Sequence, residues 1–182
     1  MEQKLIIAGI GGQGVIFVTK VLSQAGLMRG EHVMASENHG MSQRGGSVMS
    51  YVKIGGSEAP LIRRGTADAL IGFDRLEAVR NLSFVRVGGY VCVNSPNGFE
   101  SAVMPRLGEL GIKVQTINAD ACAKGLGSQA VANLVVLGFA AAHGALGFTV
   151  EELKGAAQAL GPAKAIELNL KALEMGANTA IA

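Results

Sequence analysis

The sequence predicts a doubly wound α/β fold: a mostly parallel sheet with a helical C-terminal section, in a single domain over residues 1–182. Short apolar runs alternate with amphipathic helical segments up to about residue 117, which is the pattern of such folds. Apolar residues make up 49% of the chain but aromatic residues only 4%, so the core must be aliphatic, as in buried parallel sheets. The 26 glycines suit close packing of helices on strands.

Six segments read as strands. Lys4–Ala8 is an apolar run, Ser47–Ile54 alternates apolar and polar residues through Val48, Ser50 and Val52, and the pair Gly88-Gly89 turns the chain into another run. In chain order the expected strands are Lys4–Ala8, His32–Ser36, Ser47–Ile54, Ala67–Phe73, Tyr90–Asn94 and Lys113–Ile117.

Segments whose apolar residues recur at helical spacing lie between these strands and after the last one. Apolar residues recur at helical intervals in Gln13–Arg29, and Asp74 and Glu77 place acids at the start of a helix over Arg75–Leu82. From Asp120 onward the pattern is helical. Ala130–Leu146 is expected to be the longest apolar helix. Thr149-Val150-Glu151-Glu152 has the form of a capping box, and Gly161-Pro162 separates the helix that it opens from a last one, Ala163–Met175.

Composition excludes several classes of protein. A net charge of +2 is too small to indicate a nucleic-acid partner. The two cysteines, Cys92 and Cys122, lie far apart in apolar segments without a C-x-x-C motif, so we expect buried side chains and no metal site. Glu2 and Lys4 precede a very short apolar run, which does not resemble a signal peptide. Ala130–Leu146 is too short and too polar for a membrane span. We therefore expect a cytoplasmic protein.

The most informative segment is the turn after the first strand. Gly9, Gly11 and Gly14 fit the spacing G-x-G-x-x-G, between a predicted strand and a predicted helix. Glycines let the backbone turn sharply and approach a ligand, and a helix N-terminus presents free N–H groups to a phosphate. The alternatives are a tight turn that binds nothing and a turn that contacts a partner protein.

Polar residues crowd a second segment, Ser36 to Val48. Glu37 lies 23 residues after Gly14, the spacing at which a dinucleotide-binding fold places an acid on a ribose hydroxyl. His39 is a candidate proton shuttle, or else hydrogen-bonds a partner chain. Arg44, beside Gly45-Gly46, suits bidentate binding of a carboxylate or phosphate, or an interface ion pair.

Other polar residues have plainer interpretations. Asn94, at the end of a predicted strand, is a possible residue of the ligand crevice or an ordinary turn residue. His32 and His143 are expected to be structural. A self-sufficient nicotinamide or flavin oxidoreductase remains one possible function, and a scaffold without ligand another.

Two segments together resemble a known family. The segment Ser36-Glu37-Asn38-His39-Gly40-Met41-Ser42-Gln43-Arg44-Gly45-Gly46-Ser47-Val48, with Gly11-Gly12-Gln13-Gly14-Val15, is similar to the gamma-type subunits of the 2-oxoacid:ferredoxin oxidoreductases (the pyruvate/ketoisovalerate gamma family). Within them it most resembles the beta subunits of indolepyruvate ferredoxin oxidoreductases. The resemblance covers nearly the whole chain, to Ala165–Leu173.

The resemblance implies an accessory subunit. Such complexes oxidatively decarboxylate a 2-oxoacid to an acyl-CoA and reduce ferredoxin, using thiamine diphosphate, magnesium and iron–sulfur clusters. The chain lacks the Gly-Asp-Gly…Asn arrangement and the cluster cysteines that those cofactors need. They would lie on catalytic alpha/beta-type subunits and a ferredoxin-like subunit, and the isolated chain would be inactive.

The resemblance also implies a site. Coenzyme A would be held by Gly9, Gly11, Gly12, Gln13 and Gly14, with Glu37, Asn38 and Arg44. No catalytic residue is certain, with His39 and Arg44 as the candidates. The loop favours indolepyruvate or another aryl pyruvate over pyruvate or 2-oxoglutarate. We expect an apolar patch near Asn38–Gly46 and the C-terminal helices, covered in the complex and by homodimerisation in isolation.

Overall fold

The computed structural model describes residues 2–40, 45–56, 59–161 and 163–181. The sheet has six strands in the order β2-β3-β1-β4-β5-β6. Their bounds are β1 Gln3–Ile10, β2 Val33–His39, β3 Ser47–Ile54, β4 Ala67–Gly72, β5 Val85–Asn94 and β6 Lys113–Ile117. β1, β4, β5 and β6 run parallel, while β3 is antiparallel to both β1 and β2. The mostly parallel sheet predicted from the sequence is confirmed.

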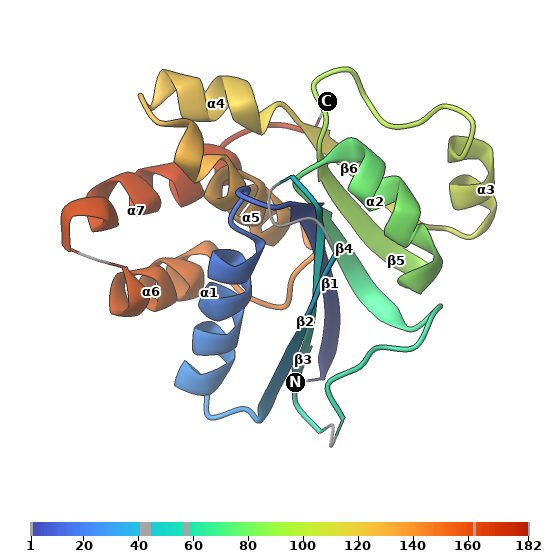
Figure 1. Cartoon of the computed structure of the whole chain (residues 1–182), viewed down its shortest axis with the longest axis horizontal. Helices are drawn as coiled ribbons and strands as arrows, with labels where there is room; N and C mark the ends of the chain where they lie inside the picture. The colour runs from blue at the N-terminus through green and yellow to red at the C-terminus, as the bar shows by residue number, and fades with distance from the viewer. Residues whose placement is uncertain (1, 41–44, 57–58, 162, 182) are drawn as a thin grey trace.

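Helices cover both faces of the sheet. In Figure 1, α1, α5, α6 and α7 lie on one side of the strands and α2 and α3 on the other. The α-helices are α1 Val15–Met28, α2 Arg75–Asn81, α3 Met104–Glu109, α4 Ala119–Gly125, α5 Ala132–Ala142, α6 Val150–Leu160 and α7 Ala163–Ala177. Two short 3₁₀ helices, η1 Leu82–Phe84 and η2 Gln129–Val131, precede β5 and α5.

Three predicted bounds were wrong for local reasons. The second strand does not end at Ser36, because its pairing with β3 continues to His39, opposite Val48. β5 starts at Val85, before the Gly88-Gly89 pair, with a register shift against β4. The first helix starts at Val15 rather than Gln13, because Gly14 has a left-handed conformation with φ of 77°.

The apolar segment Ala130–Leu146 is not one long helix. It contains η2 and the eleven-residue α5, which ends at Ala142. Gly144 has φ of 79°, and the N–H of Ala145 reaches back to the carbonyl of Ala140, the bond pattern of a glycine-terminated helix. No helix among the described residues is long and apolar enough to cross a membrane.

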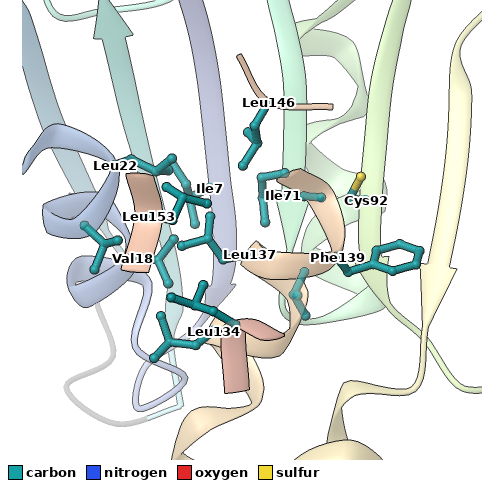
Figure 2. Close-up of a cluster of buried hydrophobic side chains, with 14 of the residues drawn as sticks. Ile7, Val18, Leu22, Ile71, Cys92, Leu134, Leu137, Phe139, Leu146 and Leu153 are labelled. Atoms are coloured by element: carbon teal, nitrogen blue, oxygen red, sulfur yellow. The ribbon is translucent and has the colours of Figure 1, made fainter. Parts of the chain in front are cut away.

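The larger core lies between the sheet and α1, α5, α6 and α7 (Figure 2). Its centre is α5, whose residues Asn133 to Ala140 are all buried. Ile7 and Ile71 of adjacent parallel strands meet Leu137 of α5 and Leu153 of α6 in this cluster. A smaller core, including Ile6 and Ala78, lies under α2 on the opposite face.

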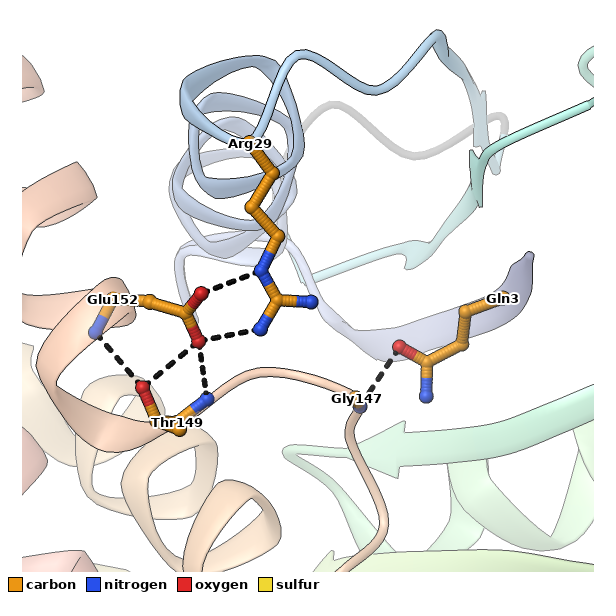
Figure 3. Close-up of polar contacts among 5 residues, drawn as sticks. All are labelled: Gln3, Arg29, Gly147, Thr149 and Glu152. Atoms are coloured by element: carbon orange, nitrogen blue, oxygen red, sulfur yellow. Dashed lines mark hydrogen bonds and ion pairs between the residues drawn. The ribbon is translucent and has the colours of Figure 1, made fainter. Parts of the chain in front are cut away.

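An ion pair joins the end of α1 to the start of α6 (Figure 3). The carboxylate of Glu152 accepts from Nε and Nη2 of Arg29, each at 2.5 Å. It also accepts from the backbone N–H of Thr149 at 2.8 Å, and the Thr149 hydroxyl completes the predicted capping box. The hydrogen bond from Arg29, followed by that from Thr149, lowers the pKa of Glu152 from 4.5 to about 2.

The contribution of Glu152 to stability should depend on pH. Its pKa is depressed in the folded state, so the stabilisation is complete above pH 4.5 and is lost as the pH falls towards 2. We expect Glu152→Gln to lower the free energy of unfolding by about 1 kcal/mol at neutral pH, as for a partly exposed ion pair. Urea titrations should show this difference shrinking between pH 4.5 and pH 2. Glu109→Gln, on exposed α3, is the matched control; an E152Q deficit that is independent of pH would contradict the assignment.

The contact between α5 and α7 needs two glycines. A Cβ on Gly138 of α5 would lie 2.0 Å from the carbonyl oxygen of Leu173, and one on Gly176 of α7 would lie 1.9 Å from that of Val135. Both obstacles are backbone atoms, which cannot rotate away. A side chain at Gly138 or Gly176 would therefore push α5 and α7 apart.

Gly138→Ala should therefore destabilise the protein by about 1–3 kcal/mol, the usual range for overpacking. Gly108→Ala in α3 is the control, because a Cβ there has no atom within 4 Å. Replacing Gly by Ala at such a helical position should be neutral or stabilise by up to about 1 kcal/mol. Thermal unfolding of the two variants compares them directly, and equal melting temperatures would refute the predicted backbone contact.

Candidate functional site: the glycine loop and the crevice beside it

The glycine loop, residues 9–14, comprises the last two residues of β1 and the turn that leads into α1. Gly12 and Gly14 have φ of 101° and 77°, values that side-chain-bearing residues rarely adopt. The backbone N–H of Gln13 bonds the carbonyl of Ile10 at 3.0 Å and closes the turn. No side chain caps the N-terminus of α1. Its first-turn N–H groups, which have no acceptor within the helix, suit an anion.

The side chain of Gln13 holds the loop in place. Its Oε1 accepts from the N–H of Ile10 at 2.7 Å, and its Nε2 donates to the carbonyl of Phe73, after β4, at 3.4 Å. A Cβ on Gly9 would lie 2.9 Å from that same Oε1 and 3.0 Å from Val15. Gly9 and Gln13 therefore shape the turn from inside the protein.

Asn133 on α5 supports the other end of the loop. Its Nδ2 donates to the carbonyl of Gly14 at 3.4 Å, and a Cβ on Gly14 would lie 2.1 Å from that nitrogen. Glycine is thus required at position 14 for two reasons: the backbone has a positive φ, and a Cβ would clash with Asn133. Sequence reasoning missed the role of Asn133, because only the three-dimensional packing brings α5 against the loop.

A cavity of about 290 Å³, the switch-point crevice, opens beside the loop. It lies at the carboxyl ends of parallel strands, where β1 leads to α1 on one face and β4 leads to α2 on the other. Open α/β sheets bind ligands at such a point. The crevice is lined by Gly12, Gln13, Phe73, Asn94, Asp120, Gln129, Ala130, Ala132, Asn133 and Val136.

Hydrogen bonds fix the far wall of the crevice. Asn94, at the end of β5, accepts from the N–H of Ala119 at 2.9 Å and donates to Oδ2 of Asp120 at 3.0 Å. The other carboxylate oxygen of Asp120 accepts from Nε2 of Gln129 at 2.5 Å. The structure therefore places Asn94 in the crevice, as its position at a strand end suggested. It adds Asp120 and Gln129, which no sequence motif indicated.

The second polar segment reaches the glycine loop from the other side. The N–H of Gly11 donates to the carbonyl of Gly46 at 2.8 Å, so the two motifs are neighbours. A second cavity, of about 300 Å³ and mostly apolar, is lined by Ile10, Gly11, Gly12, Gly14, Val15, Ile16, His39 and Val48. Arg44 lies outside the described residues.

Glu37, Asn38 and His39 all belong to β2, so their side chains alternate between faces. Nε2 of His39 lies 3.3 Å from Oε2 of Glu37, and His39, with its side chain 51% exposed, lines the second cavity. Asn38 instead lines a third cavity of about 260 Å³ that includes Glu77 and Arg80 of α2. The structure thus does not bring these three residues to one site.

Glu37 has an unusual place for a ribose-binding acid. β3 lies between β2 and β1, so Glu37 is two strand spacings, or about 10 Å, from the first strand. Neither of the two cavities beside the glycine loop includes Glu37 in its lining. The acid at the expected sequence spacing therefore does not reach the usual position in space.

Cys92 is a core residue. Its thiol donates to Oε1 of Gln115 at 2.9 Å, and burial raises its pKa to about 12, which disfavours the thiolate that binds metals. Within residues 2–40, 45–56, 59–161 and 163–181, no three His, Cys, Asp or Glu side chains gather as they would around a metal ion.

Comparisons with known proteins agree with this architecture. Residues 4–179 match the model of the family described as pyruvate ferredoxin/flavodoxin oxidoreductase. Indolepyruvate oxidoreductase subunit IorB of Archaeoglobus fulgidus is 34% identical, over 100% of this chain and 96% of that protein.

Solved structures share the fold. The gamma subunit of a keto/oxoacid ferredoxin oxidoreductase from Geobacter sulfurreducens has a TM-score of 0.76 at 24% identity, over 96% of both chains. A 2-oxoglutarate:ferredoxin oxidoreductase from Magnetococcus marinus, with 2-oxoglutarate, coenzyme A and succinyl-CoA bound, has the same score at 23% identity, over 96% of this chain and 30% of that one. The chain belongs to the pyruvate ferredoxin/flavodoxin oxidoreductase family.

Proposed function

We propose that this chain is the accessory gamma-type subunit of a cytoplasmic 2-oxoacid:ferredoxin oxidoreductase and that its glycine loop binds a phosphate of coenzyme A. The observation that carries the proposal is the uncapped N-terminus of α1 behind a loop that needs glycine at positions 12 and 14, at the switch point of the sheet. The family and the similarity to an indolepyruvate oxidoreductase subunit support the assignment of the reaction. That similarity also favours an aryl pyruvate as substrate.

Coenzyme A fits the loop on physical grounds. A cofactor with a pyrophosphate is favoured by N–H groups at a helix N-terminus, and the open space around Gly12, where a Cβ would meet no atom within 4 Å, lets phosphate oxygens come close. A likeness in fold to the Magnetococcus marinus enzyme, described with coenzyme A bound, agrees with this ligand.

The other cofactors belong on partner subunits in this proposal. Cys92 is buried with a raised pKa and Cys122 is distant in sequence, which does not fit an iron–sulfur cluster. The sequence has no Gly-Asp-Gly…Asn arrangement for thiamine diphosphate with magnesium. Catalytic alpha/beta-type subunits and a ferredoxin-like subunit would supply them, with ferredoxin as acceptor.

The proposal predicts that the isolated chain is inactive. Supplied with thiamine diphosphate, magnesium, coenzyme A and an artificial electron acceptor, the purified chain should decarboxylate no 2-oxoacid. Adding the catalytic subunits should restore turnover, which an assay of carbon dioxide release measures. Turnover by the polypeptide alone, after partner contamination is excluded by mass spectrometry, would disprove the accessory role.

Gly12→Asp should weaken coenzyme A binding to the assembled complex by roughly ten- to a thousandfold. Two like charges about 4 Å apart repel by about 1 kcal/mol in water and about 4 kcal/mol at an effective dielectric of 20, and each 1.4 kcal/mol is tenfold. The measurement is a coenzyme A titration of the assembled complex, with circular dichroism as the folding check.

A matched variant separates charge from strain. Because Gly12 has φ of 101°, any side chain there strains the backbone, and Gly12→Ala imposes this strain without charge. Binding should therefore fall more in the Asp variant than in the Ala variant. If both folded variants bind coenzyme A as wild type does, the loop is only a turn or a subunit contact.

A further inference from the structure

The end of the sheet away from the glycine loop carries a surface that the proposed cofactor site does not use. Because β1, β4, β5 and β6 run parallel, their amino ends lie together, at the end of the sheet where the N-terminus is marked in Figure 1. The glycine loop and the switch-point crevice lie at the opposite, carboxyl ends of these strands. A molecule that covers the amino ends would leave the coenzyme site open.

Two apolar side chains project from this amino-end edge. Val87, near the start of β5, is 69% exposed, and Leu61, in the segment before β4, is 61% exposed. No other large apolar side chain among the described residues is exposed to the same degree. Single exposed apolar side chains are ordinary on protein surfaces, so the charges beside these two decide what they indicate.

Three cations on the same edge have no acidic partner. Arg63 and Arg64 follow Leu61 closely in the chain, and Lys113 starts β6, the strand next to β5. All three are exposed, and none forms an ion pair with a carboxylate among the described residues. Their charge is therefore available to a partner.

The acids that line the open cavity at the starts of β1, β4 and β5 do not neutralise these cations. Asp68 accepts from Nε of Arg86 at 2.7 Å and from the backbone N–H of Lys4 at 2.8 Å. Glu2 pairs with the ammonium of Lys4 at 3.2 Å. These four charges cancel in pairs, so the edge keeps the three positive charges that have no partner.

Aromatic rings, rather than carboxylates, hold two of the three cations. The guanidinium of Arg64 lies 6.0 Å from the centre of the Phe84 ring. Nζ of Lys113 lies 4.8 Å from the centre of the Tyr90 ring and donates to its hydroxyl at 3.0 Å. A ring attracts a cation through its quadrupole and leaves the net charge in place. The two cations are thus positioned without being neutralised.

The segment that carries Arg63 and Arg64 has a fixed conformation. The hydroxyl and the N–H of Thr66 donate to the carbonyl of Arg63, at 2.8 Å and 3.3 Å. The N–H of Gly65 donates to the carbonyl of Ser83 at 2.8 Å and ties the segment to the start of β5. A surface that is already ordered loses less conformational entropy when a partner binds.

We infer that this surface, the amino-end patch formed by Leu61, Arg63, Arg64, Val87 and Lys113, docks an acidic protein surface on another subunit of the complex. The inference rests on the proposed function, which supplies the partner subunits. Fixed cations steer and orient an acidic partner, while the exposed apolar side chains offer area for it to cover. A nucleic acid fits the patch less well, since its binding depends on neutralising many phosphates.

A charge-reversed variant tests the patch. Wild type and the double variant Arg63→Glu with Arg64→Glu are titrated against the remaining subunits of the complex, prepared together without this chain. The reversal sets like charges against the acidic partner, so Kd should rise roughly tenfold or more, largely through slower association. Wild-type affinity should fall from about 0.1 M to about 1 M salt, where the Debye length shrinks from about 10 to about 3 Å. Surface plasmon resonance measures both effects.

The double variant Lys20→Glu with Lys164→Glu is the matched control. Both lysines are exposed, on α1 and α7, and neither forms an ion pair with a described residue. The control therefore changes the net charge by the same amount elsewhere on the surface, and it should bind nearly as wild type does. Hydrogen–deuterium exchange needs no variant: peptides covering residues 60–66 and 85–88 should exchange more slowly in the wild-type complex than in the isolated chain.

The outcomes are distinct. If wild type assembles but the folded Arg63→Glu, Arg64→Glu variant binds equally well, or if the two peptides exchange alike in chain and complex, the inference fails while the proposed function stands. If that variant does not fold, the exchange of wild type still decides. A homodimer, or binding of duplex DNA or anionic vesicles, that the isolated wild type shows and the variant loses would assign another occupant and overturn the inference. A folded wild-type chain that does not bind the other subunits would overturn both.

Discussion

The turn between β1 and α1 depends on the absence of side chains at three positions. Gly12 and Gly14 need a left-handed backbone, and Gly9 and Gly14 have no room for a Cβ against Gln13 and Asn133. The neighbours that occupy this space are also the groups that fix the loop, through bonds to Ile10, Phe73 and the carbonyl of Gly14. Steric exclusion and hydrogen bonding therefore specify one loop conformation, from which the crevice and the uncapped start of α1 follow.

Sequence patterns predicted correctly those features that depend on interactions over only a few residues. The bounds of β3 and β6 agree with the predicted strands, and the capping box at Thr149 is present, because alternation and capping act over a few residues. The helix expected over Ala130–Leu146 failed because composition alone did not show that Gly144 would take a left-handed conformation. The short helix α3 has no strong periodicity and was not predicted.

The candidate site was predictable only in part. The glycine spacing indicated the loop, and the end of β5 indicated Asn94, because both lie where a parallel strand ends. The position of Glu37 could not be derived, since sequence spacing does not reveal that β3 lies between β2 and β1. Asp120, Gln129 and Asn133 reach the crevice from the region after β6, and such long-range contacts leave no periodic signal in the sequence.

The position of β3 between β1 and β2 determines how the segment Ser36 to Val48 contacts the glycine loop. Because β2 and β3 form an antiparallel pair, the described ends of their connecting segment, Gly40 and Gly45-Gly46, return to the carboxyl end of β1, where Gly46 accepts from Gly11. In a fold with β2 beside β1, an acid of β2 would reach the loop directly. In this fold the hydrogen bond from Gly11 to Gly46 stands where such an acid would make its contact. His39 lines the apolar cavity on the β2 side of the loop. The glycine loop therefore lies between an apolar cavity on the side of β2 and a crevice whose buried amides are held by the protein. Such an arrangement would supply shape and fixed dipoles to a bound group, which is what the proposed coenzyme A site requires.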